Sequence, residues 1–132
     1  MTFCKAKPKG ARLLTKERIL ATMKDSGIVA VLRVDNKDEI IDIASALNKG
    51  GVKVLEITMT SPGALDSLSQ LVESKERDFI VGMGSVLDSE TARMAILAGA
   101  QFIVSPILDL ETIAMCRRYS VPCIPGAFTP TE

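Results

Sequence analysis

The amino-acid sequence predicts an α/β fold, namely a (β/α)₈ (TIM) barrel of which the chain carries about the first five strands. Short runs rich in Ile and Val alternate with longer amphipathic runs along the 132 residues, and this alternation is typical of parallel strands joined by helices. The expected strands are nearly continuous in apolar residues, as strands covered on both faces are. Polar residues also occur near the carboxyl ends of several strands, where a barrel places its active site.

A leading helix and two strands account for the first part of the chain. The helix is expected over residues 15–25, and a strand follows over 28–34. The next helix has apolar residues at helical spacing and covers 37–48. It ends at Gly50-Gly51, a usual stop signal for a helix, and the second strand covers 52–59.

Three further strand–helix units follow the same plan. The helix after the second strand is expected to start at Ser61-Pro62, because serine caps helices and proline suits the first turn. Asp88 and Asp109 are the expected caps of the next two helices. The remaining strands are expected at residues 79–86, 101–105 and 121–127.

Two architectures fit this pattern. An open, doubly wound sheet of five strands would be complete at this length, whereas a barrel typically needs about 250 residues. The barrel is favoured because the chain stops at residues 129–132, just as a further helix begins, and because polar residues occur inside apolar strands near their carboxyl ends. These residues are Arg33, Glu56, Thr58, Ser85 and Ser105. Residues 1–14 are expected to form a basic tail and residues 15–132 the partial barrel domain.

Within the second strand, the period of two places Val54, Glu56 and Thr58 on one face, and Leu55 and Ile57 on the other. A carboxylate among apolar neighbours is unfavourable to bury unless it has a purpose. Glu56 is therefore the first candidate for a functional residue.

Composition excludes several classes of function. Sixteen basic residues balance sixteen acidic residues, which argues against nucleic acid or an anionic membrane as a partner. The longest apolar runs are far shorter than the roughly 20 residues of a membrane span, and no secretory signal is recognised. The absence of histidine excludes imidazole catalysis, and no metal site is expected. Three cysteines without a CxxC pair (Cys4, Cys116 and Cys123) favour a reduced, cytoplasmic setting.

Four segments in order along the chain carry a family resemblance: VLEITMTSPGALDSL, VGMGSVL, AGAQFIVSP and IPGAFTPTE. Between about Lys16 and Glu132 the sequence resembles the 2-keto-3-deoxy-6-phosphogluconate (KDPG) and 4-hydroxy-2-oxoglutarate (KHG) aldolase family. The resemblance implies a class I lyase of the barrel fold, without metal or cofactor and trimeric in the family. A lysine forms a Schiff base with a 2-oxo acid, and cleavage releases pyruvate and either glyceraldehyde 3-phosphate or glyoxylate.

The resemblance assigns roles to Glu56 and Arg33. Glu56, in LEIT, matches the glutamate that relays protons, and an apolar barrel interior is expected to raise the pKa of its carboxyl group. Arg33, in AVLR, matches an arginine near the substrate carboxylate, which a guanidinium binds through two parallel hydrogen bonds. The alternative for Glu56 is a core glutamate that is merely paired with Arg33, and the alternative for Arg33 is a strand-end arginine that reaches solvent.

Four further positions match substrate contacts of the family. Thr60 stands where some members have arginine, and Ser85 stands where threonine is common and keeps the hydroxyl group. Pro106 belongs to a matching Ser-Pro turn, although the residue after it is isoleucine where glycine is frequent. Thr129 falls in the PGxxTPxE pattern, where it is either a substrate contact or a helix cap.

The Schiff-base lysine of the family lies on the sixth strand, in a K-x-FP motif that this sequence does not contain. By the strand repeat, that strand would begin about 10 to 16 residues beyond Glu132. Lys53 is expected to point away from Glu56, and Lys37 to start a helix, so neither replaces it. The chain alone is expected to be inactive and to associate through an open inner face. That face is expected to carry Val29, Val31, Val54, Val81 and Met83.

Other classes of function fit less well. A phosphoacceptor signalling domain needs an aspartate after the third strand and a lysine after the fifth, where the sequence has Gly84-Ser85 and Gly126-Ala127. A dinucleotide-binding domain needs G-x-G-x-x-G after the first strand, which the sequence lacks. An inactive barrel fragment that serves only in assembly is the alternative left open.

Overall fold

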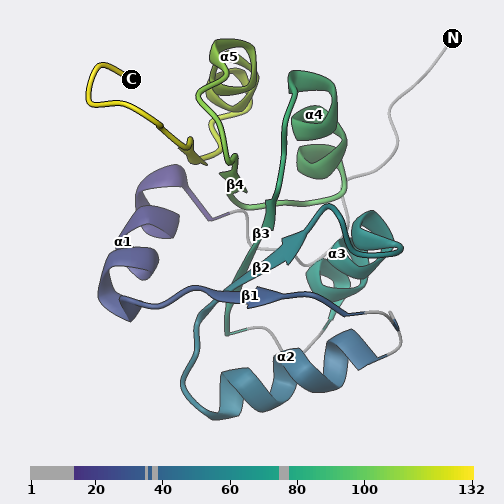
Figure 1. Ribbon diagram of the computed structural model, residues 1–132. Helices are drawn as coiled ribbons and strands as arrows, with labels where there is room; N and C mark the ends of the chain where they lie inside the picture. The colour runs from purple at the N-terminus through teal and green to yellow at the C-terminus, as the bar shows by residue number, and fades with distance from the viewer. Residues whose placement is uncertain (1–13, 35, 37–38, 75–77) are drawn as a thin grey trace, which may run out of the picture.

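The computed structural model describes residues 14–34, 36, 39–74 and 78–132. Its centre is one parallel sheet in which the strands follow one another in chain order (Figure 1). A doubly wound sheet reverses its strand order part-way, so the sequential order supports the wall of a barrel and rules out the open alternative. The strands are β1 (Ala30–Leu32), β2 (Val54–Thr58), β3 (Ile80–Gly84), β4 (Ile103–Val104) and β5 (Cys123–Ile124).

Helices alternate with these strands. In Figure 1, α2 to α5 form an arc around one side of the sheet, while α1 lies on the other side of the strands. The described helices are α1 (Lys16–Ser26), α2 (Ile40–Lys49), α3 (Ala64–Glu73), α4 (Ser89–Leu97) and α5 (Leu110–Arg118). Within the part of the chain that the structure describes, no helix combines the length and the apolar character needed to cross a bilayer.

The helix starts confirm two of the predicted caps and correct a third. Asp88 Oδ1 accepts a hydrogen bond from Thr91 N at 2.6 Å, and Asp109 Oδ2 accepts one from Thr112 N at 2.8 Å. The predicted start of α3 at Ser61-Pro62 is wrong, because the cap is Gly63, in the left-handed region at φ 64°. The Ser61 hydroxyl is 3.0 Å from Thr58 Oγ1 and is thus occupied elsewhere.

The strands are shorter than predicted, and β4 and β5 have two residues each. β1 and β5 are the edges of this sheet, so each has one neighbour to pair with. The predicted helix start at Lys37 and all of the predicted tail but Leu14 lie outside the described residues.

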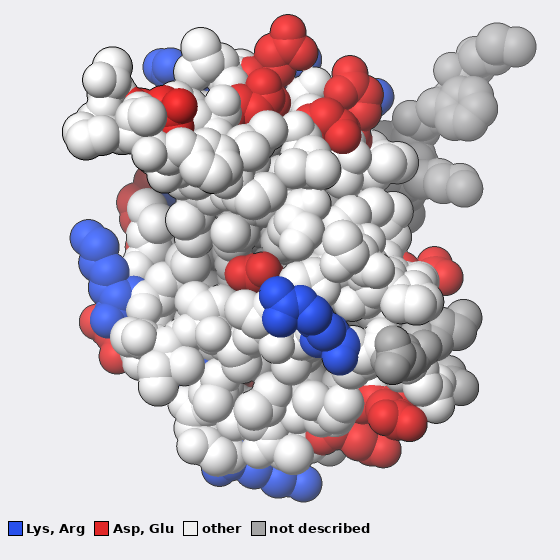
Figure 2. Space-filling view, viewed as in Figure 1, with Lys and Arg blue, Asp and Glu red and all other residues white. Residues whose placement is uncertain are grey.

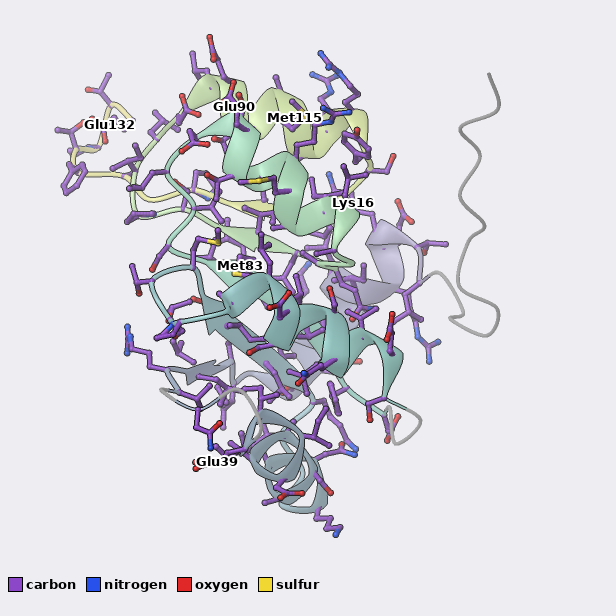
Figure 3. All side chains as sticks on the ribbon, turned by 90° about the vertical axis from the view of Figure 1, so that its right-hand side faces the viewer. Lys16, Glu39, Met83, Glu90, Met115 and Glu132 are labelled. Carbon is purple, nitrogen blue, oxygen red and sulfur yellow. The ribbon has the colours of Figure 1, made fainter. Side chains whose placement is uncertain are left out.

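The outward face of the sheet packs against the helices. Leu55, Ile57, Val81 and Met83 belong to one buried cluster with residues of α2, α3, α4 and α5. In Figure 3, Met83 accordingly lies inside the molecule beside α3 and α4. The prediction that Val81 and Met83 face the inner side was therefore wrong. Strand register explains this, because Leu55 pairs with Val81 and Ile57 with Met83, and residues paired across neighbouring strands share a face.

The inner face is closed at the start of the strands. Ile19 of α1 packs against Val54, Ile80 and Phe102, which lie on β2, at the start of β3 and just before β4. All four side chains are buried. Helix α1 therefore covers this end of the inner face. Val54 was predicted to be exposed there, and this prediction was wrong because Val54 is buried. The carboxyl ends of the strands are left for a site.

The rest of the inner face is open along β1 and β5. Val29 and Val31 are 37% and 44% exposed, as predicted, and Ile124 on β5 is 39% exposed. Apolar side chains exposed this far along two edge strands leave the inner wall of this chain incomplete.

Candidate active site

Glu56 lies in the middle of β2 with its side chain on the inner face, as predicted from the strand pattern. The residue is only 8% exposed. Its register partners are Val31 on β1 and Gly82 on β3. Burial raises the pKa of the Glu56 carboxyl group, and the positive charge of Arg33 partly opposes this shift. A carboxyl group with a raised pKa gives up and takes back a proton more readily near neutral pH than an exposed glutamate.

Gly84 on β3 provides the room for this side chain, and Gly82 provides the room for a neighbouring ring. A Cβ atom at Gly84 would overlap Glu56 Oε1 and lie 2.5 Å from Glu56 Cδ. A Cβ atom at Gly82 would lie 2.5 Å from the ring of Phe102. Since real Cβ atoms do not approach this closely, any side chain at either position would displace a neighbour. The space above β3 is therefore filled by the side chains of its neighbours, Glu56 and Phe102.

Arg33 directly follows β1 and is exposed. It is near enough to lower the pKa of Glu56, yet no ion pair joins the two side chains within the described structure. The structural pair between them is thus not formed, and the guanidinium group is free to bind a second carboxylate. Figure 2 shows basic and acidic atoms near the centre of a face that is otherwise largely uncharged there.

Thr58 is a buried polar residue that the sequence analysis noted but did not assign to the site. It is 1% exposed and lies on the same face as Glu56, two residues further along β2. Its hydroxyl donates to the carbonyl of Leu32 at 3.4 Å and contacts Ser61 Oγ at 3.0 Å. Thr58 therefore links the end of β2 to the end of β1, just before Arg33. Its spacing from Glu56 was the signal that could have identified it.

Ser85 follows Gly84 directly and is half-buried. Its backbone is left-handed, with φ 59°, a conformation that is unusual for a residue other than glycine and often found at functional sites. Since Gly84 faces the Glu56 carboxyl, the structure brings Ser85 to the same end of the site. Thr60, in contrast, is exposed in the turn after β2.

Pro106 and Thr129 lie in the loops that follow β4 and β5. Both are exposed. The first loop is held by Ser105, whose Oγ donates to the carbonyl of Ile107 at 2.9 Å. A Cβ atom at Gly126 would overlap the Pro106 carbonyl oxygen, so the two loops touch through their backbones. Thr129 Oγ1 accepts from Glu132 N at 3.3 Å, as a helix cap does.

Lys53 is engaged at the opposite end of β2 from the candidate site. Its Nζ is 2.7 Å from Asp78 Oδ2 and 2.9 Å from Asn48 Oδ1. It precedes the strand, whereas the site lies at and beyond the middle of the strand. This position agrees with the prediction that Lys53 does not face Glu56. Among the described residues, no group of three cysteine, aspartate or glutamate side chains could hold a metal ion.

Comparison with known proteins identifies the family. Residues 19–132 match the family described as "Aldolase: KDPG and KHG aldolase". The chain belongs to this family. Among curated KDPG aldolases, the 2-dehydro-3-deoxy-phosphogluconate aldolase of Haemophilus influenzae is 34% identical over 116 residues, which are 88% of this chain and 54% of that protein. The chain thus spans about half the length of the curated relatives it matches.

Solved KDPG aldolases share the fold. The enzyme of Zymomonas mobilis ZM4, crystallised with 3-phosphoglycerate, superposes with a TM-score of 0.79 at 28% identity, over 89% of this chain and 56% of that chain. The enzyme of Legionella pneumophila, with pyruvate captured as a covalent carbinolamine, has a TM-score of 0.78 at 26% identity, over 89% of this chain and 55% of that chain. The five strands described above are therefore part of the wall of such a barrel.

Proposed function

We propose that this chain supplies the first five strand–helix units of a class I aldolase that cleaves KDPG or KHG, with Glu56 as its proton relay. The observation that carries this proposal is the Glu56 carboxyl group, which is buried on the inner face with a raised pKa and lies above Gly84. Membership of the KDPG and KHG aldolase family supports the substrate class.

The reaction needs an amine and a proton relay. A lysine amine adds to the ketone of the 2-oxo acid, forming a carbinolamine that loses water to give the Schiff base. The Legionella relative with captured pyruvate is a precedent for that adduct. A base then takes the proton of the C4 hydroxyl group, the C3–C4 bond breaks and the aldehyde leaves. The bond electrons pass into the Schiff base, and protonation at C3 followed by hydrolysis releases pyruvate.

The residues of this chain serve the proton transfers and hold the substrate. Glu56 takes the hydroxyl proton and returns a proton to C3, directly or through water. Arg33 binds the substrate carboxylate, which its exposed guanidinium is free to do. Ser85, which follows Gly84, contributes a hydroxyl group to the site. The exposed residues Thr60, Pro106 and Thr129 contact the remainder of the substrate from the loops. No cofactor or metal ion takes part.

The lysine belongs to a segment that this sequence does not include. Lys53 is bound to Asp78 and Asn48 away from the site, and the sequence contains no K-x-FP motif. The active protein is a cytoplasmic homo-oligomer, trimeric as in the family. The free thiols of Cys116 and Cys123 suit the reducing cytoplasm.

A second candidate function is an inactive barrel fragment that acts only in assembly. The exposed side chains of Val29, Val31 and Ile124 favour it. In that case the inner face binds another polypeptide, and Glu56 has no catalytic part.

Borohydride trapping with pyruvate tests both candidates. The chain alone is expected to keep its mass, and a reduced pyruvyl adduct on any of its lysines would contradict the proposal. A composite protein, in which the chain is joined to the part of the Haemophilus influenzae relative that it does not cover, is expected to gain one adduct in the added part. A folded composite without adduct and without pyruvate release from KDPG or KHG would favour the assembly function.

A further inference from the structure

One row of residues crosses the inner face of the sheet at the level of Glu56. Glu56 on β2 pairs with Gly82 on β3. Met83 pairs with Ile103, and one step earlier in the same register Gly82 stands beside Phe102. The central member of the three has no side chain. Glu56 and Phe102 therefore stand on either side of Gly82, and a side chain at position 82 would fill the space between them.

The ring of Phe102 fills this gap. A Cβ atom at Gly82 would lie 2.5 to 2.6 Å from three ring carbons of Phe102, so the ring lies directly over the glycine. The ring is fully buried and is held from below by Ile19, Val54 and Ile80. It therefore has no room to move towards α1.

The Glu56 side chain occupies the next space along β3. Its Cγ and Cδ atoms would be 3.0 Å and 2.5 Å from a Cβ atom at Gly84. Gly82 and Gly84 are neighbouring inner-face positions of one strand, about 7 Å apart at the usual strand rise. The ring above one glycine and the carboxyl group above the next therefore lie side by side.

We propose that Phe102 is a positioning residue for Glu56: its ring closes the lower side of the carboxyl group against water and holds the side chain against β3 at Gly84. This inference rests on the proposed function of Glu56 for its catalytic meaning. Phe102 thereby contributes to the burial of the carboxyl group, and this burial is the main cause of the raised pKa.

No charged neighbour among the described residues accounts for the raised pKa of Glu56. Of the described charged residues, Arg33, which follows β1, is the one that acts on the Glu56 carboxyl group, and it lowers the pKa. The neighbours on β3 and just before β4 are Gly82, Gly84 and Phe102, none of which carries a charge. Water exclusion is thus what separates Glu56 from an ordinary glutamate, and Phe102 is the largest fully buried side chain beside it.

Nuclear magnetic resonance of the chain, labelled with ¹³C at the glutamate carboxyl groups, tests the proposal. Glu56→Gln identifies the Glu56 signal. In the unchanged chain, cross-relaxation between the Phe102 ring protons and the Glu56 methylene protons is expected. Its absence would overturn the proposal, because the two groups would then not be in contact.

Phe102 variants test the consequence of that contact. Phe102→Ala admits water and is expected to move the Glu56 titration midpoint down towards that of an exposed glutamate, and Phe102→Leu is expected to move it less. Phe79→Leu is the matched control, because Phe79 is a buried phenylalanine of the helix-facing cluster. If Phe102→Ala does not fold, Phe102→Leu decides alone. An unmoved midpoint in a folded Phe102 variant, or an equal shift in Phe79→Leu, would overturn the proposal.

These measurements need no substrate, so their failure is distinguishable from failure of the proposed function. If the Phe102 variants shift the Glu56 midpoint, the positioning role holds in the resting protein. If Glu56→Gln then leaves the turnover of the composite protein unchanged, the proposed proton relay by Glu56 is refuted. In an active composite, Phe102→Leu is expected to shift the acid limb of the pH profile of kcat, which a merely structural loss would not move.

Discussion

Substitution of Gly84 by alanine is the sharpest test of how the site is built. The new Cβ atom would overlap Glu56 Oε1 and lie 2.5 Å from Cδ. Carbon atoms in contact are ordinarily about 3.5 to 4.0 Å apart, so the carboxyl group must move by about 1 Å. Gly84 does not have a positive φ, and backbone strain therefore adds nothing to the effect.

The expected change in stability follows from which atoms must move. The Glu56 carboxyl group is the far end of a flexible side chain, and an off-rotamer torsion costs about 0.5 to 1.5 kcal/mol. We expect Gly84→Ala to lower the free energy of unfolding by about 1 kcal/mol. Gly82→Ala meets the rigid and fully buried ring of Phe102, and overpacking of this kind costs about 1 to 3 kcal/mol. Gly82→Ala should therefore destabilise the chain more.

Urea denaturation followed by circular dichroism measures both variants. Gly50→Ala is the control, because Gly50 is exposed, has φ −74° and would place its Cβ atom 3.3 Å from the nearest atom. Its free energy of unfolding should change by less than about 0.5 kcal/mol. Equal stabilities for Gly84→Ala and Gly82→Ala, or an unchanged Glu56 titration in Gly84→Ala, would refute this account of the site.

Two further predictions concern pH and association. The pKa of Glu56 is higher in the folded than in the unfolded chain, so the folded state binds more protons and its stability should fall as pH rises from about 4.5 through the folded pKa. Glu56→Gln removes this pH dependence. Calorimetry should therefore show that the difference in Tm between the variant and the unchanged chain grows over that pH interval. A constant difference would contradict the raised pKa. The exposed side chains of Val29, Val31 and Ile124 should make the chain associate, because burying such a side chain fully contributes about 1.5 to 3 kcal/mol. Light scattering after size exclusion should give a mass above 14.2 kDa, and Val31→Lys should lower it. A uniform monomer with sharp, cooperative unfolding would show that the open face needs no cover.

The sequence was sufficient to predict the order of the strands and the face on which Glu56 lies. In β2 a charged residue stands between apolar ones. In a barrel wall the outer face packs against helices, so the charged side chain is expected on the inner face. In β3, apolar residues occupy both faces (Ile80, Val81 and Met83), so the period of two does not say which face is inner. The pairing of Glu56 with Gly82 decides it, and that pairing is a tertiary interaction.

The same limit explains what was missed in the site. Phe102 is an ordinary core residue by its sequence, and its position beside Glu56 depends on the register between β3 and β4. Nothing in the strand pattern marks Gly82 and Gly84 as the positions over which the Phe102 ring and the Glu56 carboxyl group lie. Thr58 pairs with Ser61 and thereby takes away the cap predicted for α3. Each of these contacts joins neighbouring strands or a strand and its turn, which local pattern alone does not reveal.

The most direct test of the central claim is the turnover number of the composite protein with Glu56→Gln. Glutamine keeps the size of the side chain and removes proton transfer, and general acid–base catalysis typically contributes about 10²- to 10⁴-fold. The measurement is kcat for pyruvate release from KDPG or KHG, together with the yield of borohydride-trapped adduct. The account predicts a loss of kcat in this range with the adduct still formed, more slowly. An unchanged kcat would show that Glu56 is structural and that the relay lies elsewhere.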